Sequence, residues 1–477
     1  MNLGEREILA HAAGQAMDYL AGLPERHVGA TAGADELMKL LGGPLPERPA
    51  SPTETIDLLG RAAAEGGVVA SSGPRYFGYV VGGTLPVAIA ADWITTAWDQ
   101  NSGIFDLGPA VATAEHIAAG WLIDLLGLPA DTSVGFPTGC AMAHVTALAA
   151  ARHHVLAAAG WDVERRGLQS APPIHIVVGE QRHLTIDLAL RYLGFGTDQV
   201  HVVPADGEGR LRVEELEHVL ADCHGPTIVC AQMGDVNSGA IDPVGDISDI
   251  AHRHSAWVHV DGAFGLWAAA SPALRHLVAG VERADSWATD AHKWLNVPYD
   301  CGLVFVAHPQ AHQAAMLHTR ADYLPAGVPG ERDPIEWVPE LSRRARSLPV
   351  WAALRTLGRT GVADIIDRCC ANTRRFVTKL ESLPQVQILN DAVLNQVLVR
   401  FGDDDTLTRK VITQLQTGGV CWFGATTWHG VLAMRISVTS WRTTESDVDR
   451  TVEEIGKTLA RVRGTASAPP PPATGSA

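Results

Sequence analysis

The stretch Ala284–Gly302 reads ADSWATDAHKWLNVPYDCG, and it contains the most informative residue of the chain, Lys293. Lys293 follows a short strand-like run and stands among apolar and aromatic residues. Upstream, Asp261 closes a second apolar run, WVHVDGAFG. We expect these surroundings to lower the pKa of the lysine amine, because an amine must be unprotonated to form an imine with a carbonyl group, and a buried carboxylate can hold a positive charge nearby. The two segments predict an enzyme site at the ends of two strands.

The V-D-G-A segment at Asp261 and the H-K-W segment at Lys293 resemble those of the group II amino-acid decarboxylases, which use pyridoxal 5′-phosphate (PLP). The resemblance covers roughly residues 50–460. It implies that Lys293 forms the Schiff base with PLP and that Asp261 keeps the pyridine nitrogen protonated. It also implies an α/β fold of type I, similar to aspartate aminotransferase, and a homodimer.

Short apolar runs alternate with helix-length segments between residues 75 and 375. The runs cover residues 174–179, 199–205, 226–233, 256–263 and 301–308. Such runs are typical of a parallel sheet covered by helices on both faces. We therefore expect a large PLP-binding α/β domain over 75–375, and the resemblance implies a mostly parallel sheet of seven strands. The other expected parts are an N-terminal helical arm for dimerisation (1–74), a small α+β domain (376–464) and a disordered tail (465–477).

Small residues precede an alanine-rich helical run at Thr138, Gly139, Cys140 and Ala141. The first turn of a helix leaves backbone N–H groups free for an anion. The resembling family places the PLP phosphate on this turn with an S-x-S pair, whose two positions are Gly139 and Ala141 in this chain. We expect the backbone amides of 139–141 and the Thr138 hydroxyl to take over that contact.

The resemblance assigns further residues to the cofactor. His183 stands where the family stacks a histidine on the pyridine ring, and an imidazole there can also donate a hydrogen bond to the substrate carboxylate, which favours decarboxylation over transamination. Ala263 follows Asp261 in its motif, Asn237 is expected near the ring, and His292 near the phosphate. Asp235 replaces a hydroxyl residue of the family, and we expect its carboxylate to face a polar partner other than the phosphate.

Residues 74–101 resemble the substrate-facing segment of the family. Tyr79 provides an aromatic wall there, and Trp98, Gln100 and Asn101 add polar and aromatic surface that could also reach across a dimer. Packing at a subunit interface is an equally good interpretation of these residues. An L-amino acid with an aromatic or other bulky side chain is the expected substrate.

One family feature is missing from this chain. The family's proton donor is a loop tyrosine in D-Y-x-x-W, and this chain has RDPIEW at 332–337, so Pro334 stands in its place. Proline cannot donate a proton, and Tyr323 on the same loop is the candidate substitute. The alternatives to a decarboxylase therefore stay open: a decarboxylation-dependent aldehyde synthase, an aldolase-like lyase, an aminotransferase or a non-catalytic PLP-binding protein.

Composition limits the partners. A net charge of −16 argues against nucleic acids, and the cluster Arg343, Arg344 and Arg346 is expected to form salt bridges instead. Seven cysteines without a C-x-x-C pair predict neither a disulfide framework nor a zinc site, which indicates a reducing compartment. No apolar stretch approaches the roughly 18 residues of a membrane span. We expect a cytoplasmic enzyme with a small-molecule substrate and no membrane partner.

Overall fold

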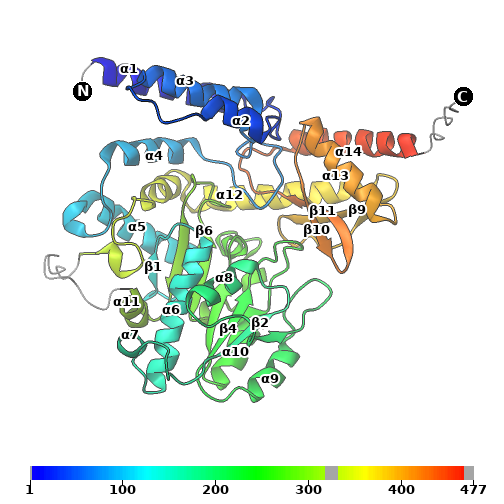
Figure 1. Ribbon diagram of the computed structural model, residues 1–477. Helices are drawn as coiled ribbons and strands as arrows, with labels where there is room; N and C mark the ends of the chain where they lie inside the picture. The colour runs from blue at the N-terminus through cyan, green and yellow to red at the C-terminus, as the bar shows by residue number, and fades with distance from the viewer. Residues whose placement is uncertain (1–2, 317–330, 467–477) are drawn as a thin grey trace, which may run out of the picture. The chain divides into compact units, whose positions relative to one another are not determined.

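The computed structural model describes residues 3–316 and 331–466, and the chain divides into two compact units. The first unit comprises residues 1–81, 374–389 and 398–477, and the second comprises 82–373 and 390–397. Figure 1 colours the elements of both units in chain order. The domain borders expected from the sequence, at 74/75 and 375/376, remain a prediction.

The second unit contains a seven-stranded sheet in the order β1-β7-β6-β5-β4-β2-β3. The pairs β2–β3, β2–β4, β4–β5 and β5–β6 are parallel, whereas β7 is antiparallel to both β6 and β1. This mostly parallel sheet confirms the expected fold. Its strands are β1 (Ser133–Gly135), β2 (His175–Gly179), β3 (His201–Val203), β4 (Thr227–Gln232), β5 (Trp257–Asp261), β6 (Ser286–Asp290) and β7 (Gly302–Val306).

Strand β7 corrects one expectation, because the run 301–308 was grouped with the parallel strands. A parallel connection needs a crossover of a dozen or more residues, usually with a helix. The connection from Ala291 to Cys301 is too short for that, so the chain turns back and β7 runs antiparallel. This turn carries Lys293.

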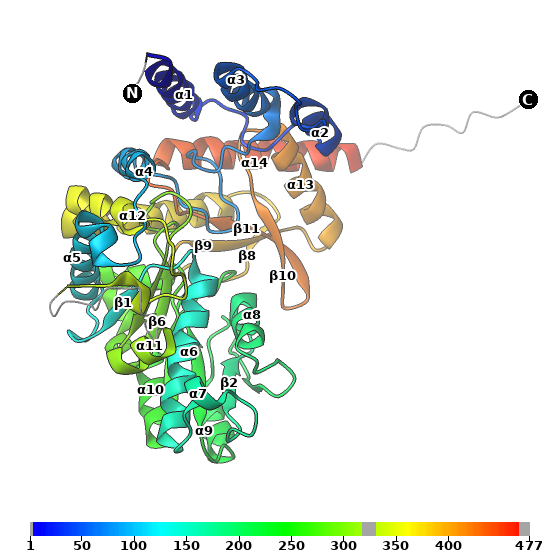
Figure 2. The same ribbon diagram turned by 60° about the vertical axis from the view of Figure 1, so that its left-hand side comes forward.

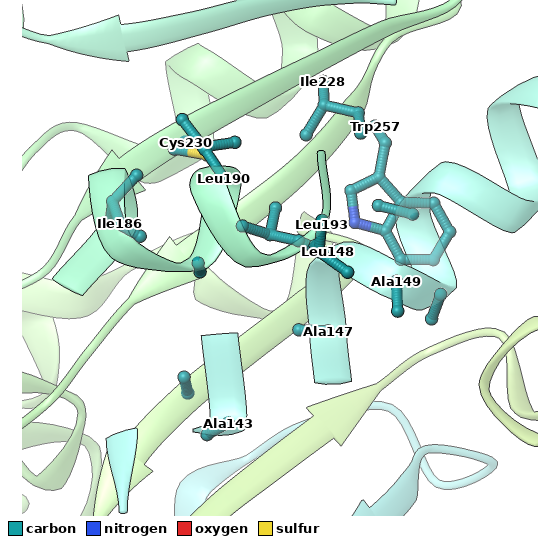
Figure 3. Packing of buried hydrophobic residues seen from close by; sticks show 14 of the residues in the cluster. Ala143, Ala147, Leu148, Ala149, Ile186, Leu190, Leu193, Ile228, Cys230 and Trp257 are labelled. Atoms are coloured by element: carbon teal, nitrogen blue, oxygen red, sulfur yellow. The ribbon is translucent and has the colours of Figure 1, made fainter. Parts of the chain in front are cut away.

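Helix α6 (Cys140–Ala158) packs along the sheet, with α8 (Leu184–Tyr192) and α11 (Pro309–Met316) next to it (Figure 2). Its alanines have short side chains, so the helix can approach the strands closely. Figure 3 shows Ala143, Ala147 and Leu148 of α6 among buried side chains of α8, β4 and β5. Full burial of a leucine such as Leu148 contributes about 1.5–3 kcal/mol. This packing fixes the first turn of α6 against the strand ends.

Six more α-helices lie wholly or mainly in the second unit: α4 (Pro86–Trp98), α5 (Pro109–Leu126), α7 (Val163–Arg166), α9 (Val213–Ala221), α10 (Val244–Arg253) and α12 (Ser347–Glu381). Helix α10 packs on β4 and β5, and α9 packs on β3. Short 3-10 helices connect these elements: η2 (Phe105–Leu107), η3 (Gly265–Ala270), η4 (Arg275–Val278), η5 (Val281–Arg283) and η6 (Pro334–Glu336).

The first unit combines helices with a four-stranded antiparallel sheet in the order β10-β11-β9-β8. Its strands are β8 (Val386–Ile388), β9 (Gln396–Phe401), β10 (Gly424–Trp428) and β11 (Val431–Ser437), and the first two residues of β9 fall in the second unit's segment. Its helices are α1 (Leu3–Gly22), α2 (Ala34–Leu41), α3 (Pro52–Ala62), the π-helical η1 (Ala63–Gly67), α13 (Asp405–Gly418) and α14 (Glu445–Ala466).

Backbone hydrogen bonds join the two ends of the chain within the first unit. Val28 donates to the carbonyl of Gly419 at 2.9 Å, and Phe77 donates to the carbonyl of Trp422 at 2.9 Å. The Arg75 guanidinium donates to the carbonyl of Val420, 345 residues away, at 2.8 Å. The early segment thus completes the structure of the late one.

In the part of the chain that the structure describes, no helix combines the length and the apolar character that crossing a bilayer requires.

Candidate active site

Lys293 lies on the turn between β6 and β7, with its side chain 20% exposed. Its Nζ is 3.0 Å from Oδ2 of Asp290, the last residue of β6. Burial lowers the pKa of Lys293, but Asp290 and the other negative groups around it outweigh burial and raise the pKa above its usual value. The amine is therefore protonated and paired here. The expectation of a lowered pKa for Lys293 is therefore wrong for this structure, in which Asp290 faces the amine.

Asp290 is a buried residue that the sequence prediction missed. Its Oδ1 accepts a hydrogen bond from the backbone N–H of Cys140 at 2.7 Å, in the first turn of α6. Asp290 thus connects the lysine turn to the turn expected to hold the phosphate. Of the three amides predicted for the phosphate, that of Cys140 is occupied by this carboxylate. The signal that could have revealed it is an acid three residues before the lysine, in D-A-H-K.

His292 is buried on the turn that carries Lys293, and its ring lies near Gly139 at the start of α6. Its Nδ1 accepts the backbone N–H of Cys301 at 3.1 Å, and burial lowers the pKa of His292. The neutral ring therefore carries its proton on Nε2, which faces Asp290 at 3.5 Å. A Cβ placed on Gly139 would lie 3.4 Å from Cε1 of this ring. The structure thus brings His292 and Gly139 together.

Asp261 is the last residue of β5, next to Ala288 of β6, so it shares the strand-end edge with the lysine turn. It is buried, its Oδ1 accepts the N–H of Ala263 at 3.1 Å, and its Oδ2 lies 3.5 Å from Nε2 of His144. Burial raises the pKa of Asp261, but His144 above all, with His183 and Lys293, outweighs burial and holds the pKa well below its usual range. Asp261 is therefore an anion.

A chain of buried hydrogen bonds leads from Asp261 into the core. Nδ1 of His144 lies 2.9 Å from Nε2 of His259, and Nδ1 of His259 lies 2.9 Å from Oγ of Ser286. The indole N–H of Trp257 donates to the same Oγ at 2.9 Å. We call these four residues the histidine relay. Burial, with repulsion from His144, lowers the pKa of His259 to about 3, so its ring is neutral.

The direction of the histidine relay follows from its two ends. An indole N–H can only donate and the ionised Asp261 can only accept. Every contact is satisfied when Ser286 donates to His259, His259 donates to His144, and His144 donates from Nε2 to Asp261. All dipoles then point their positive ends at the carboxylate. The sequence shows these histidines only as residues of apolar segments, because three separate elements bring them together.

His183 occupies the N-cap of α8. Its Nδ1 lies 2.8 Å from Oγ1 of Thr185, and its backbone N–H donates to Oε1 of Gln232 at 3.1 Å. The charge of His183 contributes to lowering the pKa of Asp261, so the structure places it on the Asp261 side of the site. Stacking on a cofactor ring stays a prediction.

The turn after β4 holds Asn237 half-buried. Asp235 accepts the backbone N–H groups of Asn237 and Ser238, each at 2.8 Å, and Gln232 donates to it at 3.2 Å. Burial outweighs these bonds and raises the pKa of Asp235. As expected, this carboxyl faces polar groups of its own turn.

Ala263 and Thr138 complete the predicted cofactor residues. The carbonyl of Ala263 accepts the N–H of Asp290 at 3.0 Å, which joins the ends of β5 and β6. Thr138 is half-buried directly before Gly139. Their contacts with a cofactor stay predictions.

Gly82 lies against the turn that carries Lys293. A Cβ at this position would lie 1.9 Å from the carbonyl oxygen of Lys293, and the nearby N–H of Leu85 donates to the carbonyl of Asn296 at 2.9 Å. The segment 82–85 therefore runs along the lysine turn. A larger residue at 82 cannot fit without moving that turn.

The predicted substrate residues are scattered. Trp98 is 52% exposed at the end of α4, and Gln100 is exposed and donates to the Trp98 carbonyl at 3.0 Å. Tyr79 belongs to the first unit, where its ring lies 5.4 Å from that of Trp422. Tyr323 lies outside the described residues. Substrate contacts by these four residues stay predictions.

Asn101 has a clear structural function. Its Oδ1 accepts the backbone N–H of Gly103 at 3.1 Å and that of Arg343 at 3.2 Å. It therefore fixes the loop after α4 to the segment that carries the arginine cluster, and its contact with a substrate stays a prediction.

Pro334 begins the short helix η6 and is buried. Next to it, Oδ1 of Asp333 accepts the N–H of Phe105 at 2.8 Å, and the N–H of Ile335 donates to the carbonyl of Gly103 at 2.9 Å. The position of the family's loop tyrosine is thus part of a packed turn.

The arginine cluster forms salt bridges, as predicted. Arg343 contacts Glu115 at 3.0 Å with both side chains fully buried. Arg344 contacts Asp92 at 2.7 Å, and Arg346 contacts Asp300 at 3.0 Å.

The residues fit PLP. An amine, an ionised buried carboxylate and a neutral histidine surround the first turn of a long helix, which is a natural site for a phosphate. Gly139 lines this cradle, since a Cβ there would approach both His292 and Asp290 within 3.7 Å.

Comparison with known proteins gives consistent results. The pyridoxal-dependent decarboxylase conserved domain matches residues 36–401. The aromatic-L-amino-acid decarboxylase of Bacillus atrophaeus is 26% identical over 93% of both chains. The cysteine sulfinic acid decarboxylase of Mus musculus is 30% identical over 65% of this chain and 63% of its own. The crystal structure of Oryza sativa TDC with PLP and tryptamine superposes with a TM-score of 0.89 and 26% identity, covering 97% of this chain and 99% of that one.

Proposed function

Because the chain belongs to the pyridoxal-dependent decarboxylases, which are PLP-dependent carboxy-lyases, we propose that its substrate is an L-amino acid with an aromatic or other bulky side chain. The products are the corresponding amine and CO2. The bacterial relative named above supports the aromatic preference, whereas the mouse relative is a cysteine sulfinic acid decarboxylase.

The observation that supports decarboxylation at this site is the ionised Asp261 at the end of the histidine relay. When bound, PLP supplies an electron sink whose strength depends on a protonated ring nitrogen. A carboxylate kept anionic by His144 at 3.5 Å is suited to hold that proton. The dipoles of the relay are already oriented, so this stabilisation costs no rearrangement during the reaction.

The other residues of the site bind and orient. Lys293 supplies the amine, and Asp290 at 3.0 Å is the group that faces the proton this amine must lose. The free amides of Gly139 and Ala141, with Thr138 and His292, would hold the phosphate. His183, held at the N-cap of α8 by Thr185, would lie against the ring and donate to the substrate carboxylate. The bond from Cα to the carboxylate breaks, CO2 leaves, and Cα takes up one proton.

The test is a product assay on the protein loaded with PLP. A panel of L-amino acids is supplied, and CO2, O2 uptake and the organic product are measured, the last by mass spectrometry. CO2 with an equal amount of the amine, highest for aromatic substrates and absent in Lys293→Ala, is the expected result. Amine formation from acidic amino acids alone would overturn the proposed side-chain preference.

Pro334 favours a second candidate function, namely decarboxylation that ends in an aldehyde. The position of the family's tyrosine proton donor is closed by a packed proline. If the proton does not return to Cα, O2 can take two electrons from the substrate and become H2O2, and water then releases the aldehyde and ammonia. Aldehyde with matching O2 consumption in the same assay would support this outcome, and amine without O2 uptake would exclude it.

We also propose a homodimer in the cytoplasm. Apolar side chains are exposed on both units, including Leu9 and Met38 of the first and Trp93, Ile94 and Trp98 of the second. A second copy is the occupant that would cover them. All seven cysteines lie in the described part of the chain, buried and without a disulfide, which supports a reducing compartment. Sedimentation velocity tests the dimer: Trp93→Glu should shift the protein toward monomer, and a wild-type monomer at micromolar concentration would contradict it.

A further inference from the structure

Three side chains of the kinds that bind transition metals meet at the amino ends of β2 and β3. His175 is the first residue of β2, His201 is the first residue of β3, and Cys223 lies between α9 and β4. Because these strands are parallel to β5, their amino ends and Asp261, at the carboxyl end of β5, lie at opposite ends of the strands. We propose that His175, His201 and Cys223 bind a Zn²⁺ ion.

The topology explains why the two histidines face each other. In the register of β2 and β3, Val177 is the partner of His201. Side chains alternate along a strand, so His175, two residues before Val177, points to the same face as Val177 and His201. Strand β4 pairs with β2 on its other side, with Thr227 beside His175, and Cys223 lies shortly before β4.

The distances agree with tetrahedral coordination. Zn–N bonds of about 2.0–2.1 Å at tetrahedral angles place two ligand nitrogens about 3.3–3.4 Å apart. Nδ1 of His175 and Nε2 of His201 are 3.3 Å apart, at a length that is also poor for a hydrogen bond between them. Sγ of Cys223 and one ring nitrogen of each histidine all lie within 4.8 Å of one another. A shift of the thiol by about 1 Å would complete three corners.

The chemistry of the three ligands favours a transition metal such as zinc. Two imidazoles and a thiolate suit zinc better than magnesium or calcium, which prefer oxygen. Cys223 is a buried thiol whose Sγ now donates to the Val219 carbonyl at 3.4 Å. Burial, with the nearby Asp222, raises the pKa of Cys223, and a bound Zn²⁺ would displace its proton. Both histidines are half-buried, so water can take the fourth position.

This site is independent of the proposed function, because no residue of it belongs to the cofactor site. The ion would connect β2, β3 and the loop after α9, and with three protein ligands and a water it would keep an open fourth position. The proposal differs from the expectation of no zinc site. That expectation rested on the missing C-x-x-C pair, whereas these ligands come from three segments that only the fold brings together.

The test uses the untagged full-length protein with PLP bound. After dialysis against a chelator, the protein is equilibrated with Zn²⁺ at pH 7.5 and bound metal is counted per chain. We expect one equivalent per chain. Cys223→Ser and His201→Ala should each weaken binding by at least about 100-fold, since even partners outside the ligand set can contribute 10- to 100-fold. His218→Ala, whose side chain is 79% exposed on α9, is the matched control and should bind as the wild type does.

Cobalt provides a readout that needs no variant. Co²⁺ in a site with a thiolate ligand gives a charge-transfer absorption from sulfur to metal, and we expect this band in the wild type. No bound Zn²⁺, or a cobalt complex without the thiolate band, would overturn the proposal. Binding that survives both substitutions would place the ion elsewhere and overturn it too.

Discussion

Replacing His144 with phenylalanine keeps a ring in the core but removes the donor that faces Asp261. Two buried polar groups lose their partners: the Asp261 carboxylate at 3.5 Å and the Nε2–H of His259 at 2.9 Å. Losing a hydrogen bond to a charged group costs about 1.5–3 kcal/mol, and an unsatisfied buried donor costs about 1–3 kcal/mol. The long contact to Asp261 places the first cost at its lower end. We therefore expect the protein without cofactor to lose about 3 kcal/mol of folding free energy.

The loss should depend on pH. In the wild type, Asp261 has a lowered pKa, so its contribution to stability is complete above the unfolded value of about 3.9 and disappears only at lower pH. In the variant, burial acts without the His144 donor and raises the pKa of Asp261. A buried carboxyl with a raised pKa destabilises the fold at neutral pH, and this cost shrinks as pH falls. The difference between the two proteins should therefore be larger at pH 8 than at pH 5.

Urea denaturation at both pH values, followed by far-ultraviolet circular dichroism, measures this difference. In thermal unfolding, a loss of 3 kcal/mol from a second unit of about 300 residues corresponds to a fall of about 5 °C in Tm.

The variant should also bind PLP about tenfold more weakly, because about 1.4 kcal/mol of anion stabilisation at Asp261 is lost. His312→Phe is the control: this histidine is equally buried and bonded to Ser133 and Trp337, so its loss should reduce stability without this effect on PLP. Equal PLP affinity in His144→Phe and wild type, with a pH-independent stability loss, would show that the relay does not act on Asp261.

Three further outcomes are expected. Lys293→Ala should abolish the absorbance of covalently bound cofactor and lower the decarboxylation rate at least about 1000-fold; a rate near that of the wild type would exclude it as the imine-forming residue. Glu115→Gln leaves Arg343 buried without its anion and should cost about 3–5 kcal/mol in urea denaturation with little change in PLP affinity, whereas an unchanged midpoint would contradict a stabilising pair. Gly82→Ala would place a methyl group 1.9 Å from the Lys293 carbonyl and should weaken PLP binding in a titration, while Gly120→Ala, with open space around it, should not; equal affinities would show that the lysine turn yields.

Much of the fold could be predicted because its signals are local. Four of the five apolar runs became parallel strands, and the run that ends in Asp261 became β5, because buried parallel strands have continuous apolar sequences. The direction of β7 was not visible in its own residues. It depends on the length of the turn between β6 and β7. That length can be counted only when the end of β6 is known.

The site divides in the same way. Lys293 and Asp261 stand in recognisable motifs, and the strand pairing brings their turns to one edge. Asp290 and His144 were missed because their importance depends on partners from other elements: Cys140 for the first, Asp261 and His259 for the second. The lysine's pKa was misjudged for the same reason, since burial alone would lower it and the neighbouring carboxylate reverses the result.

The hydrogen bonds that join the two ends of the chain have a consequence for synthesis on the ribosome. Arg75 emerges long before Val420, the residue whose carbonyl it contacts 345 residues later. At about 5–20 residues per second, the early segment waits roughly 20–70 s for its partner. During that time its apolar side chains, such as Phe77, lack the neighbours that bury them in the finished protein. Newly made chains should therefore depend on chaperones until the last helices are complete.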